Sequence, residues 1–386
     1  MSRVVGMKSR ASPRLATSSL QQEVTTHEYH GVPHSICCMA MDAEDKTTFL
    51  FTESALYAVT ASGTTALLCG DEHESGFSDG AHCQVRFSGP AGMLLDKPKK
   101  LMYVTDTGNH VVRIVQLMSG YVHSVAGLGE ISGMTDGTGD AARFHYPTGL
   151  VMCRNGSLIV SDKNNHALRI VELQGHPGNQ YGPFMGNPRP AVVTTLCGGT
   201  PGDLDGPGDQ ARFNGPMGLA VDSKGNMIVA DFHNSSIRHV VMASDGSRSC
   251  VVKTIVGYNS SKSLDDSRWH VDGDRRVARV NHPASVCVDN HDNIIVADTN
   301  NNVLRVCRLF CGRVVTIAGG PQGAGVTADG RPPPRQKPVD GRGASVRFNR
   351  PFQVMLDREG IVHVLEQFNW GAIRRLPLAV QCCEDD

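Results

Sequence analysis

This chain of 386 residues lacks several features that would place it in a familiar functional class. Its formal net charge is −1, so it carries no broad positive field of the kind that attracts nucleic-acid phosphates. No run of about 18 or more apolar residues occurs, which predicts that no segment spans a membrane. No C-x2-C pair occurs either, which argues against a zinc-ribbon or RING-type module.

The chain is also poor in aromatic residues, which form 5% of it and include 2 tryptophans. Little stacking surface is therefore expected for RNA bases. Most of the 12 cysteines lie inside apolar runs, as Cys69 and Cys197 do, and no secretory hydrophobic segment follows Met1. These features predict buried free thiols and an intracellular, cytoplasmic protein.

What the sequence does contain is a unit that repeats every few tens of residues. An Asp-Gly turn pair is followed, 7 residues after the Asp, by an Arg, then by an apolar residue and by a proline that opens an apolar run. The copies of this block are Asp79, Arg86, Phe87 and Pro90; Asp136, Arg143, Phe144 and Pro147; Asp205, Arg212, Phe213 and Pro216; Asp272, Arg279, Val280 and Pro283; and Asp340, Arg347, Phe348 and Pro351.

A second block recurs in step with the first. An acid closes the second apolar run, an Asn follows 3 residues later, and an Arg lies in the third run. The clear copies are Asp106, Asn109 and Arg113; Asp162, Asn165 and Arg169; Asp231, Asn234 and Arg238; and Asp298, Asn301 and Arg305. Four short runs bounded by turn residues predict one four-stranded antiparallel meander per unit.

The words GNHVVRI (108–114) and NNHALRI (164–170), coupled to ARF and a following proline, resemble NHL repeats. The resemblance covers about residues 33–380 and implies an all-β, six-bladed β-propeller. A unit without the turn pair, at residues 33–70, supplies the sixth blade. The expected propeller covers residues 23–386 with blades at about 33–70, 88–127, 145–198, 214–257, 281–319 and 349–382.

Residues 1–22 form a basic arm rich in Ser and Arg, with no acid. This composition is typical of a mitochondrial transit peptide, which makes a mitochondrial location the alternative, and equally of a disordered arm. A propeller also closes when one terminus adds a strand to the last blade. Either Ala379–Cys382 or N-terminal residues such as Val4 and Val5 or Glu23–Thr25 are expected to supply it.

The recurring Asp, Asn and Arg are interpreted as structural. One active site needs one set of groups, whereas equivalent sets in successive blades indicate a shared structural need. The side chains are expected to hydrogen-bond the loop between the second and third strands.

Function is therefore sought where the repeat is broken. The first strand of each propeller blade lines the central channel, so residues beside its proline are expected at one channel mouth. Blades five, six and one place polar or bulky residues there, and blade six also breaks the second block on the same face. The predicted binding residues are His34, His282, Arg350, Phe352, Gln353, Glu366 and Trp370.

Two further sites are weaker predictions. The proline-rich insertion 320–339 carries Arg331, Arg335 and Lys337, and long loops on a rigid scaffold are common recognition sites. His27, His30 and His34 are candidate zinc ligands but lack the HExxH spacing. We therefore expect no cofactor, with a metal ion in the channel as the alternative.

These features favour a non-catalytic, monomeric scaffold that binds a protein partner through loops on one face. RNA binding through a local basic face is an alternative that the near-zero net charge disfavours. A metal-dependent lyase or hydrolase with its site in the axial channel is a second alternative.

Overall fold

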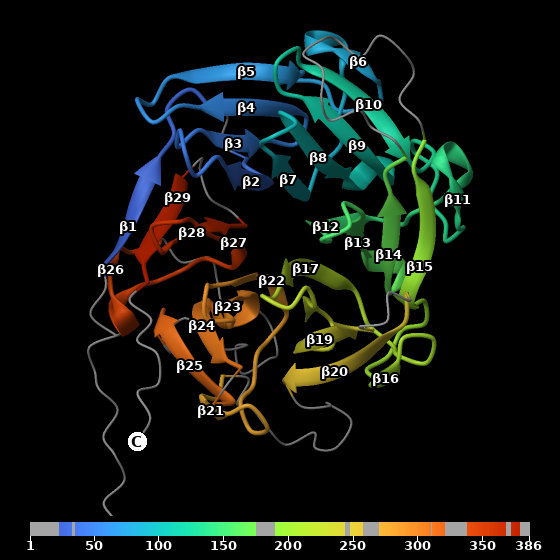
Figure 1. The fold of residues 1–386 in the computed structure, drawn as a ribbon. Coiled ribbons are helices and arrows are strands. Elements are labelled where there is room, and N and C mark those ends of the chain that lie inside the picture. The colour runs from blue at the N-terminus through green and yellow to red at the C-terminus, as the bar shows by residue number, and fades with distance from the viewer. Residues whose placement is uncertain are drawn as a thin grey trace, which may run out of the picture.

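A computed structural model describes residues 23–32, 35–174, 190–243, 248–257, 270–309, 311–320, 338–367 and 372–378. Regular structure in this part of the chain consists of β-strands and short 3₁₀ helices, without an α-helix. Six antiparallel sheets stand around a central axis (Figure 1). The prediction of an all-β, six-bladed propeller is therefore confirmed.

Blade one is a four-stranded sheet, and blades two to six each have five strands. In each blade the first long strand lies nearest the axis (Figure 1). The strands of blades one to three are β2 Cys38–Met41, β3 Thr48–Phe51, β4 Ala55–Val59 and β5 Thr65–Gly70; β6 Gly80–Ala81, β7 Gly92–Asp96, β8 Leu101–Asp106, β9 Val111–Gln116 and β10 Tyr121–Ala126; and β11 Gly137–Thr138, β12 Pro147–Met152, β13 Leu158–Asp162, β14 Ala167–Glu172 and β15 Val192–Gly198.

The remaining blades follow the same order around the ring. Their strands are β16 Gly206–Pro207, β17 Pro216–Val221, β18 Met227–Asp231, β19 Ser236–Met242 and β20 Cys250–Val256; β21 Gly273–Asp274, β22 Pro283–Val288, β23 Asn293–Asp298, β24 Val303–Arg308 and β25 Arg313–Ala318; and β26 Gly341–Arg342, β27 Pro351–Leu356, β28 Ile361–Glu366, β29 Ala372–Pro377 and β1 Glu23–Glu28. The 3₁₀ helices are η2 His82–Gln84, η3 Thr107–Asn109, η4 Gly139–Ala141, η5 Lys163–Asn165, η6 Thr299–Asn301 and η7 Gly343–Ser345.

The additional strand of blades two to six is only two residues long and follows the Asp-Gly turn pair. In blade two, β6 pairs with the fourth long strand, β10, at the outer edge of the sheet. The turn pair thus belongs to the outer rim of the blade that follows it. Sequence patterning did not predict this strand because two residues carry no alternation.

The hydrophobic core lies between neighbouring blades. One cluster joins blades two and three through Tyr103, Phe144 and Val193, and equivalent clusters occupy the other junctions. Because both faces of each sheet are covered in this way, the strands are apolar nearly throughout rather than alternating. Burial of each Val, Ile or Leu side chain contributes about 1.5–3 kcal/mol against the loss of chain entropy.

The ring closes through the N-terminal strand β1, which lies between β26 and β29 in blade six (Figure 1). Thr25 to Glu28 pair with Arg375 to Ala372, and Val24 is fully buried in the core between blades five and six. Of the sources considered from the sequence, the structure therefore uses the segment predicted at Glu23–Thr25, and the strand extends to Glu28. Residues 1–22 and 379–386 lie outside the described residues. Within the described residues, no helix is long and apolar enough to cross a membrane.

The role of β1 in ring closure predicts different results for two N-terminal deletions. Removing residues 1–28 should lower the free energy of unfolding by at least about 3 kcal/mol, because Val24 leaves the core and the pairing with β29 is lost. Removing residues 1–22 should change it by less than about 0.5 kcal/mol. Urea unfolding followed by circular dichroism measures both, and equal stability of the two variants would contradict closure by β1.

Candidate functional site

A polar cluster is buried in each of blades two to six. In blade four, Arg238 on β19 is fully buried, and its guanidinium lies 2.7 Å from the carboxylates of both Asp231 and Asp205. It also donates hydrogen bonds to two backbone carbonyl groups. Asn234 donates to Asp231 at 2.7 Å, and the backbone N–H of Asn214 does so at 2.8 Å. The buried charges are thus paired and hydrogen-bonded, as burial of charge requires.

The same geometry recurs around the ring. The Arg lies 2.7–2.9 Å from the acid of the second strand and 2.7–3.0 Å from the turn Asp. The sets of Arg, strand acid and turn Asp are Arg113, Asp106 and Asp79; Arg169, Asp162 and Asp136; Arg238, Asp231 and Asp205; Arg305, Asp298 and Asp272; and Arg374, Glu366 and Asp340. Asn109, Asn165 and Asn301 donate to their strand acids as Asn234 does.

The turn Asp also binds the fourth strand of its blade. In blade four, Asp205 accepts hydrogen bonds from the backbone N–H and the hydroxyl of Thr254, both at 2.9 Å. In blade six, the corresponding donor is Thr26 of β1, at 2.9 Å and 2.8 Å from Asp340. Each cluster therefore joins three strands and the turn before the blade, which supports the structural interpretation of the repeated Asp, Asn and Arg.

Burial dominates the titration of the strand acids. It raises the pKa of Asp231 and of Asp298 to about 6, although the neighbouring Arg and the hydrogen-bond donors act in the opposite direction. Both carboxylates are therefore mainly ionised at neutral pH, where they pair with the guanidinium.

One mouth of the channel carries a second feature in blades two to six, at the residue before the repeat proline. This residue has a left-handed backbone conformation, with φ of +54° at Gly89 and +65° at Gly215. Blades three, five and six place Tyr146, His282 and Arg350 in the same conformation, with φ of +56°, +50° and +55°. A bulky side chain in this region costs about 1–2 kcal/mol relative to glycine.

The same positions are tied to the preceding blade by hydrogen bonds. The backbone N–H of Tyr146 donates to His110 Nδ1 at 3.2 Å, and that of Gly215 donates to His166 Nδ1 at 3.1 Å. Ser235 and Asn302 accept equivalent bonds from the N–H groups of His282 and Arg350. The mouth is therefore a rigid platform built from contacts between blades.

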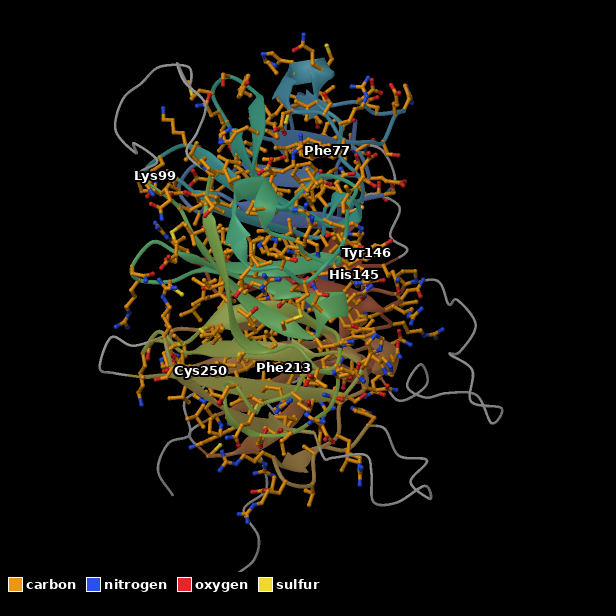
Figure 2. The ribbon with its side chains drawn as sticks, turned by 90° about the vertical axis from the view of Figure 1, so that its right-hand side faces the viewer. Phe77, Lys99, His145, Tyr146, Phe213 and Cys250 are labelled. Carbon is orange, nitrogen blue, oxygen red and sulfur yellow. The ribbon has the colours of Figure 1, made fainter. Side chains whose placement is uncertain are left out.

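Ring side chains gather on this platform. His110, His145 and Tyr146 lie with ring centroids 4.8–5.7 Å apart. Phe232, His233 and His282 form a second group at 4.9–5.9 Å. We call these rings, together with Lys163, His166 and Arg350, the ring-rich rim. Figure 2 shows His145 and Tyr146 at one face of the disc and Lys99 at the other.

Four imidazoles of the ring-rich rim are held mainly neutral. Burial lowers the pKa of His110, His166, His233 and His282 below the usual value for histidine, and neighbouring His, Lys or Arg groups at most sites lower it further. Tyr146 is 43% exposed, and the Lys163 ammonium lies 5.7 Å from the centre of the Phe232 ring. These four imidazoles, with the rings of Tyr146 and Phe232, thus give the rim a mainly uncharged surface with few cations on it.

The residues predicted from the sequence are distributed unequally. His282 and Arg350 lie on the ring-rich rim, where Arg350 donates to Asn300 at 2.9 Å. Gln353 instead bridges blade six to blade one. Its side-chain oxygen accepts a hydrogen bond from the Met39 N–H, and its side-chain nitrogen donates one to the Met39 carbonyl group. Phe352 is half-buried on β27.

Glu366 requires a correction to the expectation of an acid on the mouth face. Its carboxylate is buried against Arg374 at 2.8 Å, because it replaces the strand Asp of the repeat. His34, Trp370, Arg331, Arg335 and Lys337 lie outside the described residues.

Sequence reasoning missed His145, Tyr146, Phe232 and His233. The available signal was the residue before the proline, which is Gly in blades two and four but Tyr146 in blade three.

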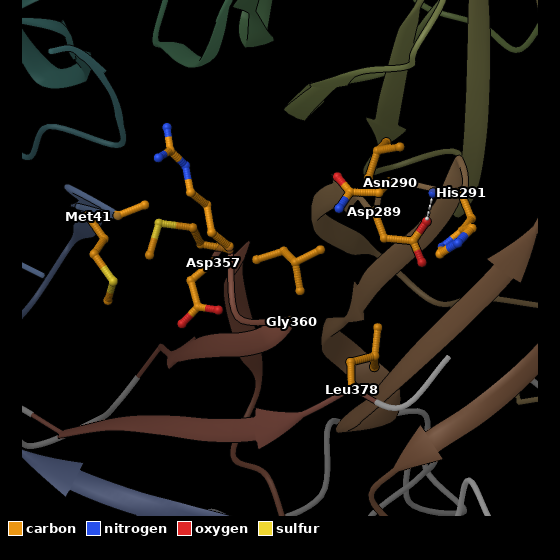
Figure 3. Close-up of a pocket in the computed structure, with 12 residues that line it drawn as sticks. Met41, Asp289, Asn290, His291, Asp357, Gly360 and Leu378 are labelled. Carbon is orange, nitrogen blue, oxygen red and sulfur yellow. Dashed lines mark hydrogen bonds between the residues drawn. The ribbon is translucent and has the colours of Figure 1, made fainter. Parts of the chain in front are cut away.

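On the opposite face, where the first strands end, two cavities adjoin at blades five, six and one. One has a volume of about 360 Å³ and is lined by residues that include Met41, Asp289, His291 and Asp357 (Figure 3). The second, of about 540 Å³, lies between blades six and one and shares Met41 and Asp357 with the first. His27 and His30 line it. No group of three or more His, Cys, Asp or Glu suited to a metal ion occurs among the described residues.

The buried cluster has a counterpart in known proteins. The family model of the NHL repeat matches residues 144–171 and 213–240. These two segments contain the Asp, Asn and Arg of blades three and four. The chain is an NHL-repeat protein.

NHL repeat-containing protein 2 of Gallus gallus is 29% identical over 145 residues, which cover 36% of this chain and 19% of that protein. The chain thus matches about a fifth of the relative's length. An auxiliary nutrient binding protein of Bacteroides thetaiotaomicron has a TM-score of 0.61 at 14% identity, with 92% of this chain and 76% of that chain covered. Virginiamycin B lyase of Staphylococcus aureus has a TM-score of 0.52 at 8% identity, with 93% and 100% covered. At these identities the structures share the fold alone.

The NHL-repeat clusters predict a large difference between two arginine substitutions. Arg238→Met should lower the free energy of unfolding by about 3–5 kcal/mol, because Asp231 and Asp205 lose their buried partner. Arg248→Met is the control: its side chain is 57% exposed and pairs with Glu172 at 2.6 Å, so the expected loss is below about 1 kcal/mol. Urea unfolding gives both values, and a loss below about 1 kcal/mol for Arg238→Met would refute the structural role.

Proposed function

We propose that this protein is a non-catalytic NHL propeller that binds a protein partner through its ring-rich rim. The observation that carries the proposal is the backbone conformation at Tyr146, His282 and Arg350. These side chains occupy a left-handed position that Gly89 and Gly215 fill in other blades. The fold itself does not need these strained, bulky residues at the channel mouth, so their presence is explained by contact with a binding partner.

The chemistry of the ring-rich rim favours a protein partner. Rings fixed on rigid backbone lose little conformational entropy on binding, and aromatic and Arg side chains commonly contribute most of the energy of an interface. The lowered pKa of His233 and of His282 leaves the surface mainly uncharged at neutral pH. A binding surface for a nucleic-acid backbone needs cations at many phosphates.

A basic ridge of Arg331, Arg335, Lys337, Arg342 and Arg350 is the local basic face on which the RNA alternative rests, and its described members give that alternative little support. Arg342 lies on β26 at the outer edge of blade six, where it is 3.4 Å from Glu23. Arg350 precedes β27 at the inner edge of the same sheet. The two arginines are therefore separated by the width of the blade.

Two substitutions that restore the repeat separate binding from folding. Tyr146→Gly and His282→Gly introduce the residue that blades two and four use, so stability should be kept or raised by up to about 1 kcal/mol. Affinity purification of the intact protein from its native cells, followed by mass spectrometry, should recover a discrete set of proteins. The double variant should recover each of them at least about tenfold less.

Met118→Ser is the control, because Met118 is 75% exposed in the turn between β9 and β10, away from the ring-rich rim. It should recover the same proteins as the unmodified chain. Nuclease treatment tests the alternative: recovery that disappears with nuclease and falls steeply with salt would indicate RNA. Equal recovery by the double variant and the unmodified chain would refute the ring-rich rim as the interface.

A further inference from the structure

The larger of the two cavities lies between blades six and one, and its lining includes side chains that differ from those at the same repeat positions in the other blades. Its volume of about 540 Å³ is within the range of small-molecule sites. His363 on β28 and Arg375 on β29 line it and are paired across the two strands. His363 is only 2% exposed.

The other blades place mostly apolar pairs at the same register. The position of His363, three residues before the strand acid, is occupied by Tyr103, Ile159, Ile228 and Ile295. The position of Arg375, directly after the buried Arg, is occupied by Ile114, Ile170, His239 and Val306. In blade four, the imidazole of His239 forms a hydrogen bond with the Asp222 carboxylate at 3.1 Å. Blade six therefore replaces a wholly or partly apolar pair with two basic side chains.

Three polar atoms in this wall have no hydrogen-bond partner among the described residues. They are Tyr29 Oη, His363 Nδ1 and Arg375 Nε, and all three residues line the cavity. Tyr29 is 7% exposed. An unsatisfied buried polar group costs about 1–3 kcal/mol, so Tyr29 Oη and His363 Nδ1 in one cavity indicate an absent partner. The Nε atoms of the buried repeat arginines also lack a partner among the described residues, so Arg375 Nε adds no separate evidence.

Among the described residues, no carboxylate forms an ion pair with Arg375. Glu359 pairs with Lys46 at 2.6 Å, and Asp357 with His363 at 2.9 Å. Glu28 lies opposite Ala372, three residues along the strand pair from Arg375. Arg375 lies close enough to lower the pKa of both His27 and His363. The unneutralised cation favours an anion.

The second contact is set by the tautomer of His363. Burial lowers the pKa of this imidazole, so it is neutral, and its Nε2 faces the Asp357 carboxylate. Nε2 therefore carries the hydrogen and donates it to Asp357, which leaves Nδ1 as a bare acceptor. Nδ1 requires an O–H or N–H donor from a ligand.

We propose that the cavity between blades six and one binds a small oxyanion, a carboxylate or phosphate, that also carries a hydroxyl group. Arg375 binds the anionic oxygens, and His363 Nδ1 accepts a hydrogen bond from the hydroxyl. Met41, Val59 and Ile361 line the cavity as well and leave room for an apolar part of the ligand. This site is on the face opposite the ring-rich rim and does not depend on the proposed partner.

Two matched pairs of probes test the two contacts separately by titration calorimetry of the full chain at constant ionic strength. L-lactate carries the hydroxyl that propionate lacks, and inorganic phosphate carries the hydroxyl that sulfate lacks. The hydroxyl-bearing member of at least one pair should bind at least about fivefold more tightly than its mate. Preference in the first pair assigns a carboxylate, and preference in the second a phosphate.

His363→Ile and Arg375→Ile reproduce the pair that blade three carries at this position. Both should keep the unfolding temperature or raise it, because Asp357 retains hydrogen bonds from the backbone N–H groups of Glu359 and Ile361. Arg375→Ile should lower the affinity for the preferred probe at least about tenfold. His363→Ile should abolish the preference for the hydroxyl-bearing member of the pair. Arg375→Gln serves as the second variant if Arg375→Ile does not fold.

Arg248→Gln is the control, since Arg248 of blade four pairs with Glu172 at 2.6 Å and lines neither cavity. It should change affinity less than about twofold. Absence of binding by every probe overturns the proposal, as does binding that Arg375→Ile leaves unchanged. Equal affinity within both pairs overturns the hydroxyl contact to His363.

Discussion

The buried pairing of an arginine with two carboxylates is the interaction on which the propeller depends. Desolvation of such charges is costly and is offset here by ion pairs and hydrogen bonds at the two terminal nitrogens of each guanidinium. Here one guanidinium joins the second strand, the third strand and the turn before the blade, and the turn Asp holds the fourth strand. The blade is consequently specified as a unit, and neighbouring blades join through apolar surfaces and a small set of hydrogen bonds.

Ring closure uses this same interaction across the greatest distance in sequence. Thr26 donates to Asp340 as Thr254 donates to Asp205, although 314 residues separate the first pair. The N-terminal strand is therefore recruited by the chemistry of an ordinary fourth strand. Its register could have been predicted, since Ser124, Thr195, Thr254 and Thr316 mark this position in the other blades. This six-residue strand has no clear alternation of polar and apolar residues and gave no other signal.

The repeat predicted the fold because its turn pairs, prolines and arginines fix the register of each blade independently. It predicted the candidate site only in part. His282 and Arg350 were found because they interrupt a pattern beside the proline, while Tyr146 was missed because glycine's role at that position becomes apparent only from the backbone φ. Glu366 was placed wrongly because the change from Asp to Glu was interpreted as an interruption of the repeat. The Glu side chain is one carbon longer than Asp, and it still forms the ion pair with Arg374.

Blade one shows what happens where the buried pair is lost. Thr52, Tyr57 and Leu67 occupy the positions of the strand acid, the Arg and the fourth-strand donor, and the Tyr57 hydroxyl binds Glu72 at 2.6 Å instead. Blade one therefore contributes no arginine cluster to the seam with blade six, where Gln353 bridges the two sheets. Because blade one lacks the arginine cluster, the junction between blades six and one accommodates His363 and Arg375 in place of the mostly apolar pairs of the other blades. The junction that completes the ring is thus also the junction best suited to hold a ligand.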